Sequence, residues 1–302
     1  MAVRSSTYLF WQKYLGHPLQ AIFAWILVTL VRLLPLDTAS NLGGWIARKI
    51  GPGLKVTNKA RHNLKNAFPE KAEAELEEII LGMWDNLGRT AFEFPHLGSI
   101  DIQNDSNRFE VVNSENFSLL DDENTPAIYW GGHLANWEVG ALSAAHFGRP
   151  CTAIFRAPDN QWVSKLFFER GHHPKLDLVP KGSKGAKKVM GVLKAGGNLG
   201  ILVDQKMNDG IAVPFFGRDA MTAPALATFA LKYKCNVVPA RIERLGGAPK
   251  FRITIFPAMV LPDTGDRQAD TLALMTDVNA MLEGWIKERP EQWLWLHKRW
   301  PN

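Results

Sequence analysis

The chain has 302 residues, of which 46% are hydrophobic and 22% charged, and its formal net charge is +5 at pH 7. The length suits one large α/β domain, and the apolar content excludes an intrinsically disordered chain. The modest basic excess suits an anionic lipid surface or an acidic protein partner, and because no nucleic-acid-binding motif accompanies it, we expect no nucleic-acid partner.

The first expected element is an apolar segment. Residues 18–31 contain no charged residue, and the apolar run continues beyond Arg32. A membrane-spanning helix needs about 20 such residues, so residues 1–36 fit a single-span anchor, an interfacial helix or a buried helix. More positive charge follows the segment than precedes it, and we therefore expect the rest of the chain to stay on the cytoplasmic side of a membrane.

Residues 37–302 are expected to form one α/β domain whose helical amino-terminal part covers about residues 40–95. From about residue 109, short apolar runs alternate with helical stretches, which predicts a mostly parallel central sheet flanked by helices. The expected strands are residues 127–130, 152–155, 176–179, 199–203, 237–242 and 252–256, the last of them half exposed or at an edge. The expected helices are residues 71–94, 136–147, 161–171, 184–193, 224–234 and 267–288.

The stretch AIYWGGHLANWEVG, residues 127–140, is the most informative part of the chain. A strand runs into two glycines, then His133, then a helix that Asn136 is expected to cap. On a continuous helix His133 and Glu138 would lie about 140° apart, so contact requires His133 in the turn before the helix. Glu138 would then hold one imidazole nitrogen and leave the other to accept a proton from a hydroxyl group.

This stretch resembles the H-x4-D/E motif of glycerolipid acyltransferases, in the H-x-x-N-W-E form typical of the lipid A late acyltransferases, the lauroyl and myristoyl transferases. The resemblance covers residues 15–300, because further segments follow the family in the same order. These segments are RHNLKNAFPE from Arg61, RAPDN from Arg156 to Asn160, VDQ with Asp204 and Gln205, VPFFG with Thr222 after it, and PEQWLWLHKR from Pro290.

The resemblance implies an inner-membrane enzyme whose catalytic domain faces the cytoplasm. It would move a fatty acyl group from an acyl carrier protein thioester, or from a coenzyme A thioester, to a hydroxyl of a lipid A precursor or similar glycolipid. His133 would act as the general base and Glu138 would orient it, with no metal and no cofactor besides the thioester co-substrate. The other implied site residues bind substrate: Asn136, Arg156, Asn160, Asp204, Gln205 and Arg218.

Several interpretations stay open at this point. The guanidinium of Arg156 suits a phosphate, while Asp204 and Gln205 could hold substrate, hydrogen-bond the His133 region or cap a turn. A membrane-bound thioesterase or lipid hydrolase would use water in place of the lipid hydroxyl, and another glycolipid or phospholipid could be the acceptor.

Three smaller features also have more than one interpretation. The basic run at residues 181–188 could contact an acidic carrier protein or lipid phosphate, or form a solvated helix start. In the carboxy-terminal tail, alternating aromatic and basic residues favour the membrane interface over packing on the core. The pair His172-His173 favours a solvated turn over a metal site, and the two cysteines, Cys151 and Cys235, begin apolar runs that look like buried strands.

Overall fold

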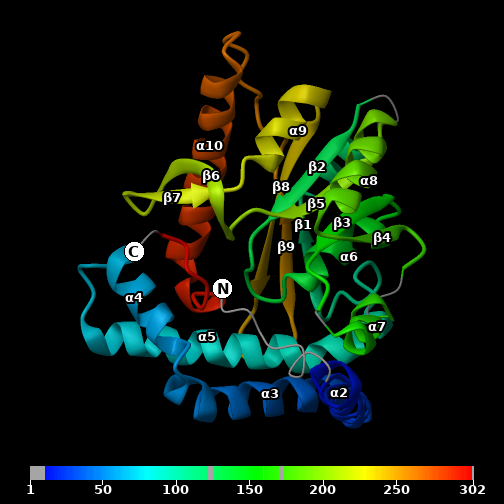
Figure 1. Ribbon diagram of the computed structural model, residues 1–302, viewed down its shortest axis with the longest axis vertical. Coiled ribbons are helices and arrows are strands. Elements are labelled where there is room, and N and C mark those ends of the chain that lie inside the picture. Colours follow the sequence, from blue (N-terminus) through cyan, green and yellow to red (C-terminus); the bar gives the residue numbers. More distant parts are fainter. Residues whose placement is uncertain (1–10, 122–124, 159, 170–172, 301–302) are drawn as a thin grey trace.

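A computed structural model describes residues 11–121, 125–158, 160–169 and 173–300, and its core is a seven-stranded sheet (Figure 1). The strands lie in the order β1-β9-β8-β2-β5-β3-β4. Their bounds are Phe109–Val112 for β1, Ala127–Gly131 for β2, Cys151–Phe155 for β3, Leu176–Pro180 for β4, Asn198–Leu202 for β5, Asn236–Arg244 for β8 and Phe251–Ile255 for β9.

Five neighbouring strands of this sheet, from β8 to β4, are parallel, which confirms the predicted mostly parallel arrangement. Strand β9 runs antiparallel to β8 and alternates between buried and half-buried residues, as expected from its sequence. It does not lie at the edge, however, because β1 pairs with its other side. Strand β1 was not predicted, since it has only four residues and one of them is Glu110.

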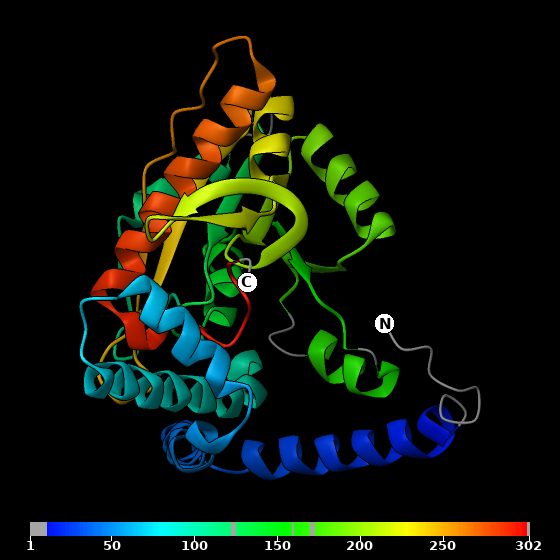
Figure 2. The ribbon, with the colours of Figure 1, turned by 60° about the vertical axis from the view of Figure 1, so that its left-hand side comes forward.

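Helices cover both faces of the sheet (Figures 1 and 2). Ile128 and Trp130 of β2 belong to a core cluster with α8, α9 and α10, whereas Ala127 and Tyr129 pack in a second cluster with α6. This alternation follows from the two-residue repeat of a strand. The five predicted helices of this region are present, with these bounds: α6 Glu138–His146, α7 Gln161–Glu169, α8 Ser183–Lys194, α9 Ala225–Tyr233 and α10 Arg267–Glu288.

A separate antiparallel hairpin, β6 (Lys206–Phe215) and β7 (Arg218–Thr222), was not predicted. Its two turn residues, Phe216 and Gly217, both have positive φ, at 52° and 67°. That conformation matches the twist of the flanking strands and is typical of two-residue hairpin turns. The polar first half of β6 lacks the alternation that marks a half-buried strand, which hid the hairpin in the sequence.

The amino-terminal helices form the base of the molecule in Figure 1: α2 (His17–Arg32), α3 (Leu36–Ile50), α4 (Thr57–Ala67) and α5 (Glu73–Glu93). Helices α3 and α5 pack closely because glycines face each other at their contact. A Cβ atom on Gly88 would lie 2.2 Å from the Gly43 carbonyl oxygen, so neither position has room for a side chain. The helical prediction for this region is confirmed, and α5 bridges α3 and the sheet.

Candidate active site

The carboxyl ends of two neighbouring parallel strands bring His133 and Asp204 together. Strand β2 ends at Gly131 and strand β5 ends at Leu202. The pairing of these two segments continues for one more residue, because the Val203 amide donates to the Gly131 carbonyl at 3.1 Å. In open parallel sheets this edge is where ligands bind.

Asp204 is fully buried and holds His133 in two places. Its Oδ1 lies 2.6 Å from Nδ1 of the imidazole, and its Oδ2 accepts the His133 backbone amide at 2.8 Å. The indole Nε1 of Trp293 donates to the same Oδ2 at 2.7 Å. A Cβ atom on Gly132 would lie only 2.7 Å from the buried Leu282 side chain, which favours a glycine directly before the histidine.

His133 and Asp204 each stabilise the charged form of the other. Burial lowers the pKa of His133, but the charge and hydrogen bond of Asp204, together with the charge of Glu138, outweigh burial and hold this pKa above its ordinary value. Burial raises the pKa of Asp204, yet the charge and hydrogen bonds of His133 hold it well below its usual range. Asp204 therefore stays ionised, and Nδ1 of His133 keeps its proton.

The other imidazole nitrogen, Nε2, lies on the accessible side of the ring. It is 3.3 Å from the amide nitrogen of Gln205, whose side chain is exposed, and 13% of the His133 side chain remains exposed. The Trp137 ring packs beside the imidazole at 5.1 Å. With Nδ1 committed to Asp204, Nε2 is the atom that can accept a proton from a substrate.

The sequence predicted that Glu138 would orient the imidazole, but the structure gives the orienting hydrogen bond to Asp204. Glu138 is the first residue of α6 and acts on His133 through its charge. Asn136 accepts the Glu138 amide at 3.3 Å, as its predicted capping role requires. It is fully buried and donates to Glu93 at 2.8 Å, so it supports the loop from inside and does not face a substrate.

The remaining predicted site residues lie farther from this pair in the fold. Arg156 is exposed directly after β3, and Arg218 is exposed at the start of β7, in the separate hairpin. Asn160 is buried; its amide donates to the His17 carbonyl of α2 at 2.7 Å, and its Oδ1 accepts the Trp162 amide of α7 at 3.0 Å. Asn160 thus fastens α2 to the domain. Of the predicted set, the structure gathers His133, Glu138, Asp204, Gln205 and Asn136 at the sheet edge.

The carboxy-terminal segment supports the histidine loop, a role that sequence reasoning missed. Gln292 accepts the Ala135 amide at 2.9 Å, and the Leu294 amide donates to the His133 carbonyl at 3.2 Å. His297 donates from Nε2 to the Asp204 carbonyl at 3.1 Å. The prediction that this tail favours the membrane interface was wrong, because its three tryptophans, Trp293, Trp295 and Trp300, are buried in the core.

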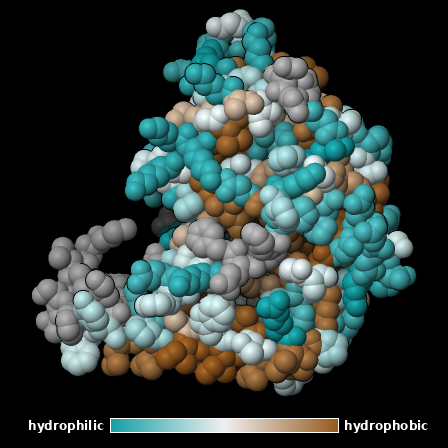
Figure 3. All heavy atoms as spheres, turned by 90° about the vertical axis from the view of Figure 1, so that its right-hand side faces the viewer, coloured by the Kyte–Doolittle hydropathy of each residue, from teal (hydrophilic) through white to brown (hydrophobic). Residues whose placement is uncertain are grey.

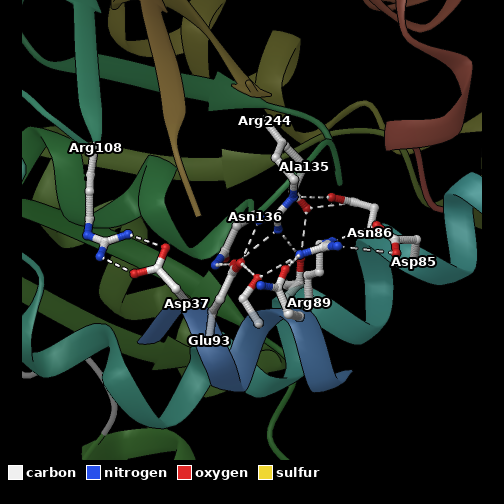
Figure 4. A network of polar contacts seen from close by, with 12 residues as sticks. Asp37, Asp85, Asn86, Arg89, Glu93, Arg108, Ala135, Asn136 and Arg244 are labelled. Atoms are coloured by element: carbon white, nitrogen blue, oxygen red, sulfur yellow. Dashed lines mark hydrogen bonds and ion pairs between the residues drawn. The ribbon is translucent and has the colours of Figure 1, made fainter. Parts of the chain in front are cut away.

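A buried polar network braces the same loop from the other side (Figure 4). Ala135 has a strained positive φ of 49°, and its carbonyl accepts hydrogen bonds from Asn86 and Thr90 of α5, both at 3.1 Å. Arg244 of β8 forms a buried ion pair with Glu93 of α5 at 2.5 Å. The loop is therefore held between α5, β8 and the carboxy-terminal segment.

Two of the other segments that resembled the acyltransferase family, RHNLKNAFPE and VPFFG, converge on this support. Asn63 of α4 donates to the carbonyls of Trp295 and His297 at 2.9 and 2.8 Å. The Phe68 ring packs against Phe216, at 5.4 Å, and against Trp295, at 5.8 Å. In the part of the chain that the structure describes, the hydrogen bonds and ring contacts of these two segments do not include Asp204. They position the carboxy-terminal segment, which in turn bonds Asp204. A hollow of about 530 Å³ opens beside Phe68 and Phe216, away from His133.

The fold is a mostly parallel α/β sheet, and the candidate site at its carboxyl edge pairs a histidine with a buried carboxylate. Residues 11–302 match the family described as bacterial lipid A biosynthesis acyltransferase, and the chain belongs to this family. It is therefore an acyltransferase of lipid A biosynthesis.

Three relatives match nearly the whole chain, each at 24% identity. One is the lipid A biosynthesis acyltransferase of Haemophilus influenzae, over 295 residues that cover 95% of this chain and 86% of the relative. The lipid A biosynthesis palmitoleoyltransferase of Escherichia coli matches over 298 residues, 96% of this chain and 91% of the relative. The lipid A biosynthesis lauroyltransferase of Escherichia coli matches over 279 residues, 89% of this chain and 87% of the relative.

Proposed function

We propose that the protein transfers a fatty acyl chain from an acyl carrier protein thioester directly to a hydroxyl of a lipid A precursor, at the cytoplasmic face of the inner membrane. The observation that carries this proposal is the His133–Asp204 pair, in which Asp204 occupies Nδ1 and leaves Nε2 on the accessible side. A histidine arranged in this way can take a proton from an alcohol as the oxygen attacks a carbonyl group.

In this mechanism the acceptor oxygen forms a bond to the thioester carbonyl carbon while Nε2 of His133 takes the hydroxyl proton. Asp204 stabilises the imidazolium, and Glu138 adds a second negative charge nearby. The tetrahedral intermediate then breaks its carbon–sulfur bond. The imidazolium returns the proton to the departing thiolate, which leaves as a thiol and yields the new ester.

A direct transfer, without an acyl-enzyme intermediate, suits the chemistry of the two cysteines. Both are buried, and burial raises the pKa of each thiol to about 12, so neither supplies a thiolate at neutral pH. Cys151 also begins β3, at the end of the sheet opposite the His133 edge. Rapid quenching followed by intact-protein mass measurement should show no acylated enzyme, and an accumulating acyl-enzyme would reject the direct mechanism.

Exposed basic side chains lie at the carboxyl edge of the sheet, beside β3 and β4. We propose that an acidic thioester donor binds there. Arg156 follows β3, and Lys181 and Lys184 follow β4, all three exposed. Their guanidinium and ammonium groups suit the phosphate of a pantetheine arm and the acidic surface of a carrier protein. We expect the doubly substituted Lys181→Glu/Lys184→Glu enzyme to show a raised KM for the carrier thioester, with kcat nearly unchanged.

The matched control for that experiment is Lys194→Glu, which reverses an exposed charge at the far end of the same helix, α8. The control should leave KM for the carrier thioester unchanged. Acyl coenzyme A, tested in parallel, reports whether the effect is specific to a protein donor. Equal effects of the double and control substitutions would reject a carrier site at this edge.

The whole proposal is tested by transfer of a radiolabelled acyl chain from acyl carrier protein to a lipid A precursor, with the wild type and His133→Ala. We expect transfer that requires the lipid acceptor and falls about a thousandfold or more in the variant. Release of free fatty acid that does not depend on added lipid would instead identify a thioesterase.

A further inference from the structure

The base of the molecule carries a broad apolar surface, which we call the basal surface and define as the exposed apolar side chains of α2 and α3. Figure 3 shows it as a brown band along the bottom of the molecule. Trp45, on α3, is 60% exposed, which is unusual for so large an apolar side chain. Its members on α2 are Leu19, Ile22, Phe23, Trp25, Ile26, Leu27 and Leu30, and those on α3 are Leu42, Trp45 and Ile50.

Helix α2 is fastened to the domain at both of its ends. The His17 carbonyl accepts a hydrogen bond from Asn160, and the Val31 carbonyl accepts one from His96 at 3.2 Å. Between these points only a narrow stripe that includes Ala21 faces the domain, and the rest of the helix surface is exposed. As Figure 2 shows, α2 runs sideways along the bottom of the molecule and passes beneath α7.

Helix α3 continues the same surface. Its Gly43 packs against α5, and Trp45, two residues further on, points about 200° away around the helix. One helix thus uses its small residues to bind the domain and its large apolar residues to face outward.

The exposed charges on the chain segment that forms the basal surface are mostly positive. Residues 14–59 contain a single acidic residue, Asp37, and its charge is paired with Arg108. The basic residues in this region are all exposed: Arg32, Arg48, Lys49, Lys55 and Lys59. Apolar side chains bordered by exposed cations match the interface of a bilayer that contains anionic lipids.

We propose that α2 and α3 together form a monotopic membrane footprint, in which α2 lies parallel to an anionic bilayer and does not span it. By length and composition alone, residues Tyr14–Arg32 could cross a membrane, with 19 residues and a mean hydropathy of 1.5. A spanning orientation, however, would carry the attachment at Asn160 and the attachment at His96 to opposite depths of the bilayer. It would also leave Trp45 in water, whereas the flat orientation buries both helices at once.

This inference rests on the proposed function, because a lipid acceptor must reach His133 from the membrane. The geometry places the catalytic loop one helix layer above the footprint, since α3 packs on α5 and the Ala135 carbonyl accepts hydrogen bonds from α5. An acceptor whose headgroup lies at the interface would need to rise past that layer only.

The first experiment measures binding of the full-length protein to vesicles of phosphatidylethanolamine and phosphatidylglycerol by flotation. Trp45→Asp should weaken binding about tenfold or more, because a large apolar side chain is replaced by a charge that anionic lipid repels. The control is Val260→Asp, which changes an 88%-exposed apolar residue after β9, at the opposite edge of the sheet, and should bind as the wild type does. Equal binding of both variants would overturn the footprint.

The second experiment distinguishes a flat helix from a span. Because Cys151 and Cys235 are buried and burial raises the pKa of both thiols, a spin label can be directed to Ile26→Cys, Trp45→Cys or Val260→Cys. On vesicles the labels at 26 and 45 should both lie at a similar shallow depth, with the label at 260 in water. A label at 26 near the bilayer centre with the label at 45 in water would establish a span and reject the proposal. If the wild type binds vesicles in this manner but transfers no acyl chain, the proposed function fails while the footprint stands.

Discussion

The indole nitrogen of Trp293 donates to the same Asp204 oxygen that accepts the His133 backbone amide. Trp293 therefore shares one carboxylate oxygen with the loop that carries His133. This arrangement fixes the orientation of Asp204 and moderates how strongly its charge attracts the imidazole proton.

Trp293→Phe removes this hydrogen bond and keeps most of the ring packing. We expect kcat to fall about 10- to 100-fold, in line with the loss of a buried hydrogen bond to a charged group. The pKa of His133 should rise further, because the full charge of Asp204 then acts on it, so the acid limb of the pH–rate profile should move to higher pH. Trp295→Phe is the control: its indole donates to the Pro290 carbonyl and not to Asp204, so it should not move the profile.

The wild-type profile itself follows from the raised pKa of His133. A base is active when unprotonated, so the acid limb of kcat/KM should lie above pH of about 6.5, the ordinary histidine value. Asp204→Asn removes the main charge that raises this pKa, and the limb should move to lower pH. In this variant kcat should also fall by about 10³- to 10⁴-fold, because an amide no longer fixes the correct tautomer.

Glu138→Gln tests the role that sequence reasoning assigned to this residue. It removes a charge that raises the pKa of His133 but leaves the Asp204 hydrogen bond intact. We expect a shift of the acid limb in the same direction as in Asp204→Asn, but smaller. A larger loss and shift than in Asp204→Asn would make Glu138 the principal partner of the histidine.

The buried ion pair between Glu93 and Arg244 should dominate the stability of the catalytic loop. Arg244→Met leaves Glu93 charged and buried, and we expect it to lower the free energy of unfolding by about 3–5 kcal/mol. Arg252→Met breaks an exposed pair with Glu110 and should cost less than about 1 kcal/mol. Thermal unfolding in detergent compares the two, and similar losses would show that burial is not decisive.

The contact between α3 and α5 is tested by a pair of glycine substitutions. Gly88→Ala places a Cβ atom against the Gly43 carbonyl and should destabilise the protein by about 1–3 kcal/mol. Gly191→Ala, on an exposed part of α8 with no atom near the added Cβ, should stabilise it by about 0.5–1 kcal/mol. Unfolding temperatures that rise in both variants would contradict the close packing of these helices.

Much of this architecture was predictable because local patterns carry it. The alternation of apolar runs and helical stretches indicated the parallel sheet, and two glycines before His133 marked the turn of the candidate site. The carboxylate partner was harder to identify. Asp204 follows β5, which pairs with β2 although β3 and β4 lie between them in the sequence, and this strand order is not visible in the sequence.

For the carboxy-terminal tail, the sequence pattern predicted the wrong environment. Its alternation of aromatic and basic residues favoured a membrane interface, since both environments offer an indole one apolar and one polar neighbour. In the fold, Trp293 finds the polar neighbour in Asp204, and Arg299 is likewise buried against Thr222 and Asn279. A pattern of residue types predicts the kind of neighbour that a side chain needs, but not which distant segment supplies it.

The contacts of Gln292, Trp293 and Leu294 also have a consequence for the order in which the molecule is made. A chain still emerging from the ribosome carries His133 and Asp204 long before it carries the residues that brace them. Contacts between residues so far apart in the sequence form late in folding, because forming them costs the conformational entropy of the long chain segment between the two residues. Nascent and partly folded chains would therefore hold the catalytic pair unsupported, and activity would mark the completion of folding.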